Sequence, residues 1–285
     1  MAVDIAPELY ERIQRRFQEK YDKAMLYGNP ISDMRRKLEA GEATFQDADI
    51  YAVEVGSMLS DSMLEVLQLE EMPNQTLYYN IAQRTIGTSL QDTYGLVSSV
   101  AAEVQEEMNL ANGIGLKAVK PEANLERIGG LVEKASEAKD QSTLANILKG
   151  PVENLVMSAV DDTVKANAKY QSDAGMNTKV IRIYDGKGLH DGKDSCQFCL
   201  SRQGTYTYPE AVKHDVFRRH VGCGCIIDYQ SYKTRIRLSA GQGKGWKEDV
   251  LSRQEAEELE KRILEQQQTN KPDMSGLLAL INGVK

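Results

Sequence analysis

The sequence has no cysteine outside one short stretch. All four cysteines of the 285 residues lie between Cys196 and Cys225, together with two of the three histidines. The sequence also has no run approaching eighteen apolar residues, so no membrane-spanning helix is expected. Its first residues contain no apolar signal core. We therefore expect a protein made and kept in the cytoplasm, where clustered cysteines indicate metal or redox chemistry more often than structural disulfides.

Proline and aromatic residues are scarce, with 7 prolines and 6% aromatic residues, and this composition favours helix in a globular protein. The net charge of −7 argues against a general nucleic-acid coating protein. The charge is unevenly distributed, because thirteen Lys or Arg and only eight Asp or Glu lie between Thr178 and Val250. The sequence therefore joins an acidic part to a basic, cysteine-bearing part.

Residues 1–174, which we call the helical domain, show helical periodicity. Breaks at Asn29-Pro30, Pro73-Asn74 and Gly113–Gly115 separate its segments, and Gly150-Pro151 predicts the start of a last helix. One long helix is predicted over 74–112. Its apolar stripe consists of Ile86, Leu90, Tyr94, Val97, Ala101, Val104 and Met108. This near-heptad spacing favours packing inside a bundle of the same chain, with self-association as the alternative.

After residue 175 the pattern changes to alternating strands and loops. Segments "TKVIRIYDG", "CIIDYQSY" and "TRIRLSA" are predicted strands. Residues 175–240 form the predicted α+β unit, which we call the cysteine module, and 241–285 form a predicted helical tail. The expected fold class is mainly α with this small α+β module.

The cysteine spacing is that of a zinc knuckle. Cys196-x-x-Cys199 is a ligand pair in a tight turn, and Cys223 and Cys225 point to one face if they begin a strand. The sequence predicts a structural Zn²⁺ held by these four thiolates. His220 is either an alternative fourth ligand or a hydrogen-bond donor to a ligand sulfur.

Two other interpretations of the cysteines stay open. They form a redox Cys-x-x-Cys pair or catalytic thiol, or they are reduced cysteines without metal. A redox pair normally opens a helix after a strand, and the Gly- and Tyr-rich surroundings are less typical of that setting. No nucleophile elbow or outstanding carboxylate pair is present, so we predict no catalytic residues and no enzyme activity.

These residues also carry a family resemblance. The order of Cys196, Cys199, Gly204 and then His220-x-x-Cys223-x-Cys225 before a strand resembles the C-terminal module of MuF-like minor head proteins of tailed bacteriophages. The resemblance covers roughly residues 160–232. The sequence departs from the family pattern at Val221, where many members have proline, and at Ser195, where some have another cysteine.

The resemblance implies a structural minor head (minor capsid, head morphogenesis) protein, located in the virion at the head or portal. Such proteins act in head assembly or in DNA packaging and ejection, with the portal protein or the major capsid protein as partners. The alternatives are a zinc-dependent nucleic-acid-binding module and an unrecognised enzyme. Packaged DNA is a further expected partner through basic side chains, which are Arg218, Arg219, Lys233, Arg235 and Arg237. The same side chains could equally form ion pairs with the acidic helical domain.

Overall fold

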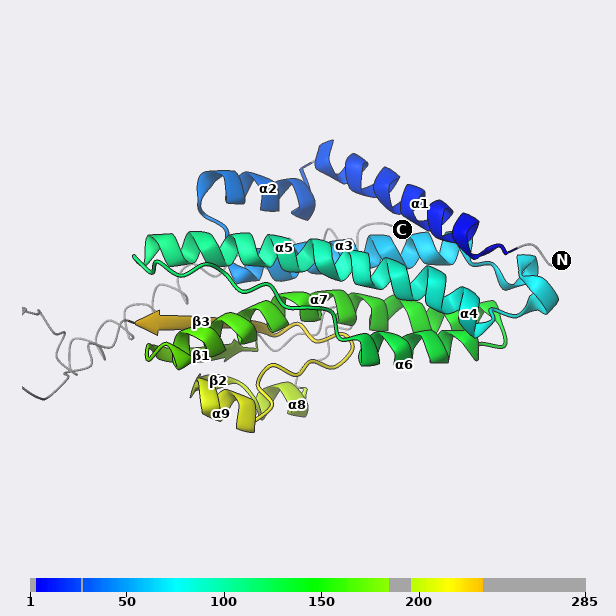
Figure 1. Cartoon of the computed structure of the whole chain (residues 1–285). Helices are drawn as coiled ribbons and strands as arrows, with labels where there is room; N and C mark the ends of the chain where they lie inside the picture. Colours follow the sequence, from blue (N-terminus) through cyan, green and yellow to red (C-terminus); the bar gives the residue numbers. More distant parts are fainter. Residues whose placement is uncertain (1–3, 27, 185–195, 233–285) are drawn as a thin grey trace, which may run out of the picture. The chain divides into compact units, whose positions relative to one another are not determined.

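The computed structural model describes residues 4–26, 28–184 and 196–232 (Figure 1). The helices are α1 (Ala6–Leu26), α2 (Pro30–Ala40), α3 (Phe45–Val66), α4 (Tyr79–Ala82), α5 (Thr88–Ala111), α6 (Leu125–Ser136), α7 (Gln141–Asp173), α8 (Gln197–Leu200) and α9 (Tyr208–Lys213). The strands are β1 (Asn177–Ile183), β2 (Gly204–Thr207) and β3 (Ile226–Tyr232). None of the helices in the described ranges is long and apolar enough to cross a membrane.

Polar side chains at the helix starts explain where three of the helices begin. The Asn29 side chain accepts hydrogen bonds from the backbone N–H groups of Ile31 and Ser32 at the start of α2. Thr44 and Asp47 form a capping box at the start of α3, and Asp140 caps α7. These contacts satisfy backbone donors that have no partner within the helix.

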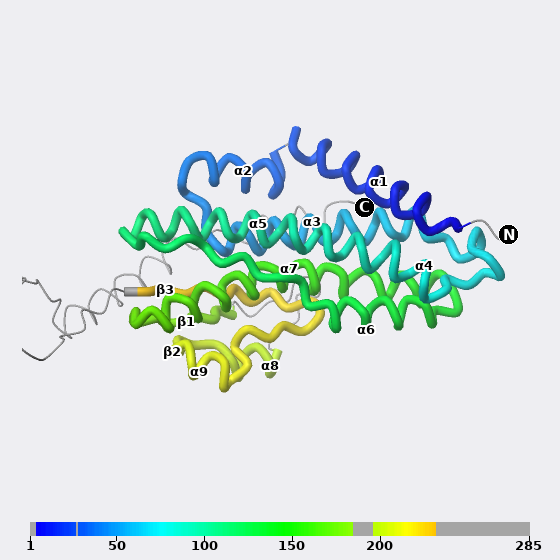
Figure 2. The backbone as a smooth tube through the Cα atoms, in the orientation of Figure 1, coloured from blue at the N-terminus to red at the C-terminus, as the bar shows by residue number. Residues whose placement is uncertain are grey.

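The core of the helical domain is built around α3, α5 and α7, which run alongside one another, and α1 and α2 cover one side (Figures 1 and 2). The predicted stripe on α5 faces this core. Leu90 and Val97 are fully buried, and Tyr94 is 2% exposed. The stripe therefore packs within the chain, as the sequence favoured, and cannot serve as a surface for self-association.

Two predicted helix boundaries are wrong. The helix predicted over 74–112 begins at Tyr79, because Asn74 adopts a left-handed conformation with φ of 53°, and it contains a π-helical turn over Gln83–Gly87 between α4 and α5. Pro151 does not begin a helix but lies inside α7, which starts ten residues earlier at Gln141. The Asp140 cap and the buried face that continues from Leu144 through Gln171 outweigh the lost hydrogen bond at the proline.

The strands form one antiparallel sheet in the order β2-β1-β3. Val180 of β1 lies opposite Tyr206 of β2 and Tyr229 of β3. Val180, Ile227 and Tyr229 belong to the same buried cluster as the helices, so the cysteine module shares the core of the helical domain and the described residues form one compact unit. The predicted mainly helical fold with a small strand-containing cysteine module is confirmed. The predicted third strand from 234 and the helical tail lie outside the described residues.

Candidate metal centre

Two turns bring the predicted ligands together. Cys196 is the N-cap residue of the one-turn helix α8, and Cys199 lies within that helix. His220 and Cys223 lie in a turn closed by a 3.1 Å hydrogen bond from Cys223 N–H to the His220 carbonyl. Gly222 has a φ of 74° in this turn, a left-handed conformation that glycine adopts without strain.

The ligand atoms lie near the separations of a metal site, with the two N···S distances a few tenths of an ångström shorter than in tetrahedral zinc. The Nε2 atom of His220 is 3.2 Å from the Cys196 Sγ and 3.1 Å from the Cys199 Sγ, and the Sγ atoms of Cys199 and Cys223 are 3.6 Å apart. Tetrahedral zinc, with bonds of about 2.0–2.3 Å, places its ligand atoms about 3.5–3.8 Å from one another. Two groups of donors have all their ligand atoms within 4.8 Å: Cys196, Cys199 and His220, and Cys199, Cys223 and Cys225. These five residues, which we call the donor cluster, therefore lie close enough to hold a metal ion.

The imidazole of His220 is oriented for coordination through Nε2. Its Nδ1 lies 2.8 Å from the Val221 carbonyl oxygen, which can only accept a hydrogen bond, so Nδ1 carries the proton. In the neutral ring Nε2 then has a free lone pair, and this lone pair faces the two sulfurs. The Phe198 ring meets the imidazole edge-on, with ring centroids 5.5 Å apart. His220 is therefore held in the tautomer and orientation of a metal ligand.

Three of the thiols are buried, and they interact with one another. Cys199, Cys223 and Cys225 are each 1% exposed. The hydrogen bond with Cys225 lowers the pKa of Cys223 to about 4, and the guanidinium of Arg219 contributes to the same effect. Conversely, the hydrogen bond to Cys223 and burial raise the pKa of Cys225, so Cys225 keeps its proton more tightly. The lowered pKa of Cys223 favours its thiolate, which is the form that binds metals.

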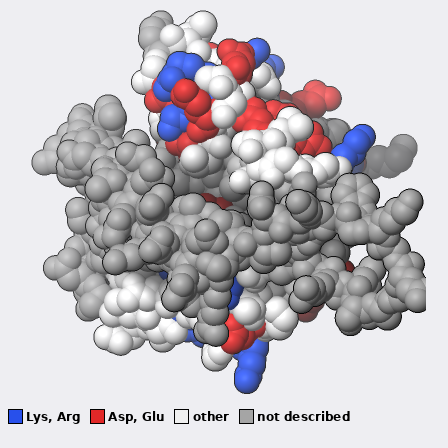
Figure 3. All heavy atoms as spheres, turned by 90° about the vertical axis from the view of Figure 1, so that its left-hand side faces the viewer, with Lys and Arg blue, Asp and Glu red and all other residues white. Residues whose placement is uncertain are grey.

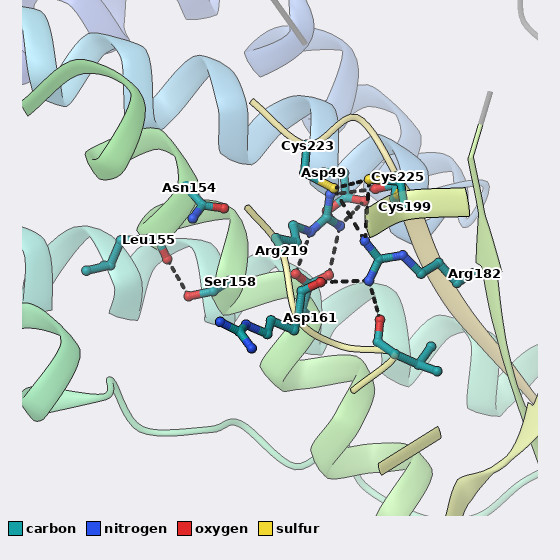
Figure 4. A network of polar contacts seen from close by, with 12 residues as sticks. Asp49, Asn154, Leu155, Ser158, Asp161, Arg182, Cys199, Arg219, Cys223 and Cys225 are labelled. Carbon is teal, nitrogen blue, oxygen red and sulfur yellow. Dashed lines mark hydrogen bonds and ion pairs between the residues drawn. The ribbon is translucent and has the colours of Figure 1, made fainter. Parts of the chain in front are cut away.

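The sulfurs contact an arginine that no sequence motif indicated. Arg182 on β1 is 2% exposed, and its Nη2 lies 3.5 Å from the Cys223 Sγ and 3.9 Å from the Cys199 Sγ. Its Nη1 donates to the backbone carbonyls of Val216 and Arg218, at 2.5 and 2.7 Å (Figure 4). A buried positive charge beside the sulfurs favours their thiolate forms. The charged-apolar alternation of the β1 segment was the available signal, but it predicted only a strand.

Arg219 lies in the interior and not on the surface, so the expected contact between this residue and DNA is wrong. Its side chain is 2% exposed and pairs with Asp49 and Asp161. Both carboxylates belong to the helical domain, so the ion pairs considered as the alternative are the ones formed. Arg218 is exposed. Lys233, Arg235 and Arg237 lie outside the described residues.

Basic side chains do not gather into one patch on the described part of the face that Figure 3 displays. Positive and negative side chains are interspersed there. On α2, for example, Arg35 pairs with Glu39 at 3.1 Å and Arg36 with Asp33 at 3.5 Å. On the described part of this face, the mixed charges therefore form no concentrated positive patch for a phosphate backbone.

The position of Cys196 at the start of α8 resembles a redox pair more than the sequence indicated, because the Cys-x-x-Cys segment does open a short helix. The imidazole within 3.2 Å of both sulfurs and the third sulfur beside Cys199 distinguish this arrangement from a two-cysteine redox pair.

Comparison with protein-family models, with curated proteins and with solved structures found no match for this chain. The fold and site thus define a helical protein with a candidate metal centre of sulfur and nitrogen donors.

Proposed function

We propose that the protein is a structural minor head protein of a tailed bacteriophage, associated with the portal or capsid and acting in head assembly or in DNA packaging or ejection. The observation that carries this proposal is the Cys196-x-x-Cys199 and His220-x-x-Cys223-x-Cys225 pattern, whose donors lie in two neighbouring groups that share Cys199. The shared core of helices and sheet is compatible with a structural protein, because it makes one compact unit that can present assembly contacts.

The donor cluster would hold a structural Zn²⁺. Thiolates and imidazole are the donors that zinc prefers, and four of them close a structural site. The orientation of His220 favours Cys196, Cys199, His220 and Cys223 as the four ligands, in place of the four cysteines predicted from the sequence. Cys225 would then act from outside, through its hydrogen bond to Cys223. A zinc ion bound there contributes folding free energy and ties α8 to the turn before β3.

Cobalt substitution distinguishes the two ligand sets. Co²⁺ in a tetrahedral sulfur site has visible absorption bands that shift when an imidazole replaces a thiolate. We expect His220→Ala to change this spectrum strongly and Cys225→Ser to change it little. A larger change with Cys225→Ser than with His220→Ala would instead support the four-cysteine site.

The role in the particle is tested by purifying heads from infected cells and probing them for this chain. We expect a low, fixed number of copies in heads and none in isolated tails. Cys199→Ser, which removes the residue common to both donor groups, should reduce incorporation. Ser201→Ala, an exposed change in the same module, should not. Finding the wild-type chain only in lysate and never in heads would refute the proposal.

A further inference from the structure

Arg219 connects the donor cluster to the helical domain through five hydrogen bonds (Figure 4). Its Nε and Nη2 donate to the two carboxylate oxygens of Asp161 on α7, at 2.5 and 2.8 Å. Nη2 also lies 3.0 and 2.9 Å from the two carboxylate oxygens of Asp49 on α3. Nη1 donates to the backbone carbonyl of Cys225 at 2.5 Å. The guanidinium therefore contacts α3, α7 and the donor cluster at once.

Because of its position in the chain, Arg219 can hold both ends of the segment that carries His220, Cys223 and Cys225. It directly precedes His220, and its Nη1 holds the carbonyl at the other end of the same segment, at Cys225. The segment from His220 to Cys225 is thus held at both ends by one side chain. Because the guanidinium is planar and rigid, its donors reach all three partners only in one orientation.

Neighbouring contacts restrict the same segment further. Arg182 binds the carbonyls of Val216 and Arg218, just before the segment begins. The turn also packs closely on α7, where a Cβ at Gly150 would lie only 2.6 Å from a methyl group of Val221. The location of the His220 and Cys223 donors is therefore determined by α3, α7 and β1, and not only by the turn itself.

We propose that Arg219 is a positioning residue of the metal centre, which sets the His220–Cys225 segment against α3 and α7 so that metal affinity depends on the helical domain. This inference rests on the proposed metal site. Groups that orient ligands without touching the ion typically contribute about 10–100-fold to metal affinity. Arg219 orients the His220–Cys225 segment through its hydrogen bond to the Cys225 carbonyl, and the carboxylates of Asp49 and Asp161 hold Arg219 in place.

The test compares Arg219→Lys with Arg218→Lys in the full chain. Both variants keep the charge, but only the first removes the planar fork from the buried network, because Arg218 is exposed. The dissociation constant for Zn²⁺ is measured by competition with a chromophoric chelator, and far-UV circular dichroism reports the helical fold. We expect Arg219→Lys to bind Zn²⁺ about 10–100-fold more weakly. Arg218→Lys should stay within about twofold of wild type, the range of an exposed change.

A folded Arg219→Lys variant that binds Zn²⁺ within about twofold of wild type, even with a lower melting temperature, overturns the proposal, because the arginine would then only stabilise the fold. If Arg219→Lys does not fold, Asp161→Asn provides the same measurement with a milder change, and unaltered Zn²⁺ affinity in that variant overturns the proposal equally. A wild-type chain that binds no Zn²⁺ overturns this inference and the metal site together. The role in phage heads is tested separately by the particle experiment.

Discussion

Asp49 and Asp161 are positioned by the crossing of α3 and α7. Gly56 allows the two helices to approach each other closely at this crossing. A Cβ at position 56 would lie 2.8 Å from the Cα of Glu153 and 3.4 Å from the Cβ of Val156. Carbon atoms pack best at about 3.5–4.0 Å, and the nearer atom belongs to the backbone, which cannot rotate away. Gly56→Ala therefore forces the two helices apart by roughly 1 Å.

The expected change in stability follows from two opposing terms. Overpacking of this kind costs about 1–3 kcal/mol, while alanine in a helix is favoured over glycine by about 1 kcal/mol. We expect Gly56→Ala to lower the free energy of unfolding by about 1 kcal/mol, measured by urea denaturation. It should also weaken Zn²⁺ binding, because the carboxylates that hold Arg219 move with the helices.

Gly95 provides the matched control. It lies in the interior of α5, and a Cβ there would have no neighbour within 4 Å. The same substitution, Gly95→Ala, should therefore raise the free energy of unfolding by about 0.5–1 kcal/mol. Equal stabilisation by both substitutions would show that the α3–α7 crossing tolerates an added methyl group, which would contradict close packing at Gly56.

Three further predictions concern pH, the α5 stripe and the metal. Burial raises the pKa of Asp49 to about 7. Between about pH 4 and 7 the folded state therefore keeps a proton that the unfolded state releases. The free energy of unfolding should fall as pH rises through this range, by at most about 1.4 kcal/mol per pH unit. Urea titrations at several pH values should show a shallower fall for Asp49→Asn, and an identical slope would contradict the assignment. Leu90→Asp should unfold the chain, because Leu90 is fully buried. Unfolding would be seen as loss of the helical circular dichroism signal. A folded variant that only changes oligomeric state would refute the intramolecular packing. Protein prepared without chelator should contain about one Zn²⁺ per chain, and EDTA should lower its melting temperature in calorimetry. Four freely titrating thiols in a folded, zinc-free protein would exclude the site.

Local features of the sequence predicted much of the fold. Asn29 before Pro30 and the apolar stripe of α5 act over a few residues, so their meaning can be read along the chain. Elements that depend on distant contacts were predicted wrongly. Pro151 signals a helix start by its local chemistry, but α7 continues through it because residues on both sides are buried against α3 and α5.

The donor cluster, like the fold, was predicted only in part from local features of the sequence. The spacing of the four cysteines and His220 predicted the donors, because each ligand pair lies within one turn of the chain. The proposed choice of His220 over Cys225 rests on the orientation of the ring, whose Nδ1 lies 2.8 Å from the Val221 carbonyl oxygen. No spacing rule contains that contact.

The sequence by itself determined the helical character, the confinement of the thiols to one module and the identity of the candidate ligands. Only the tertiary structure decided that the module and the helices form one body and that Arg219 joins them. Arg219 is 170 residues from Asp49 and 58 from Asp161 along the chain. A charged side chain enters the interior only where partners from distant segments compensate its lost hydration, and their convergence is a property of the folded chain.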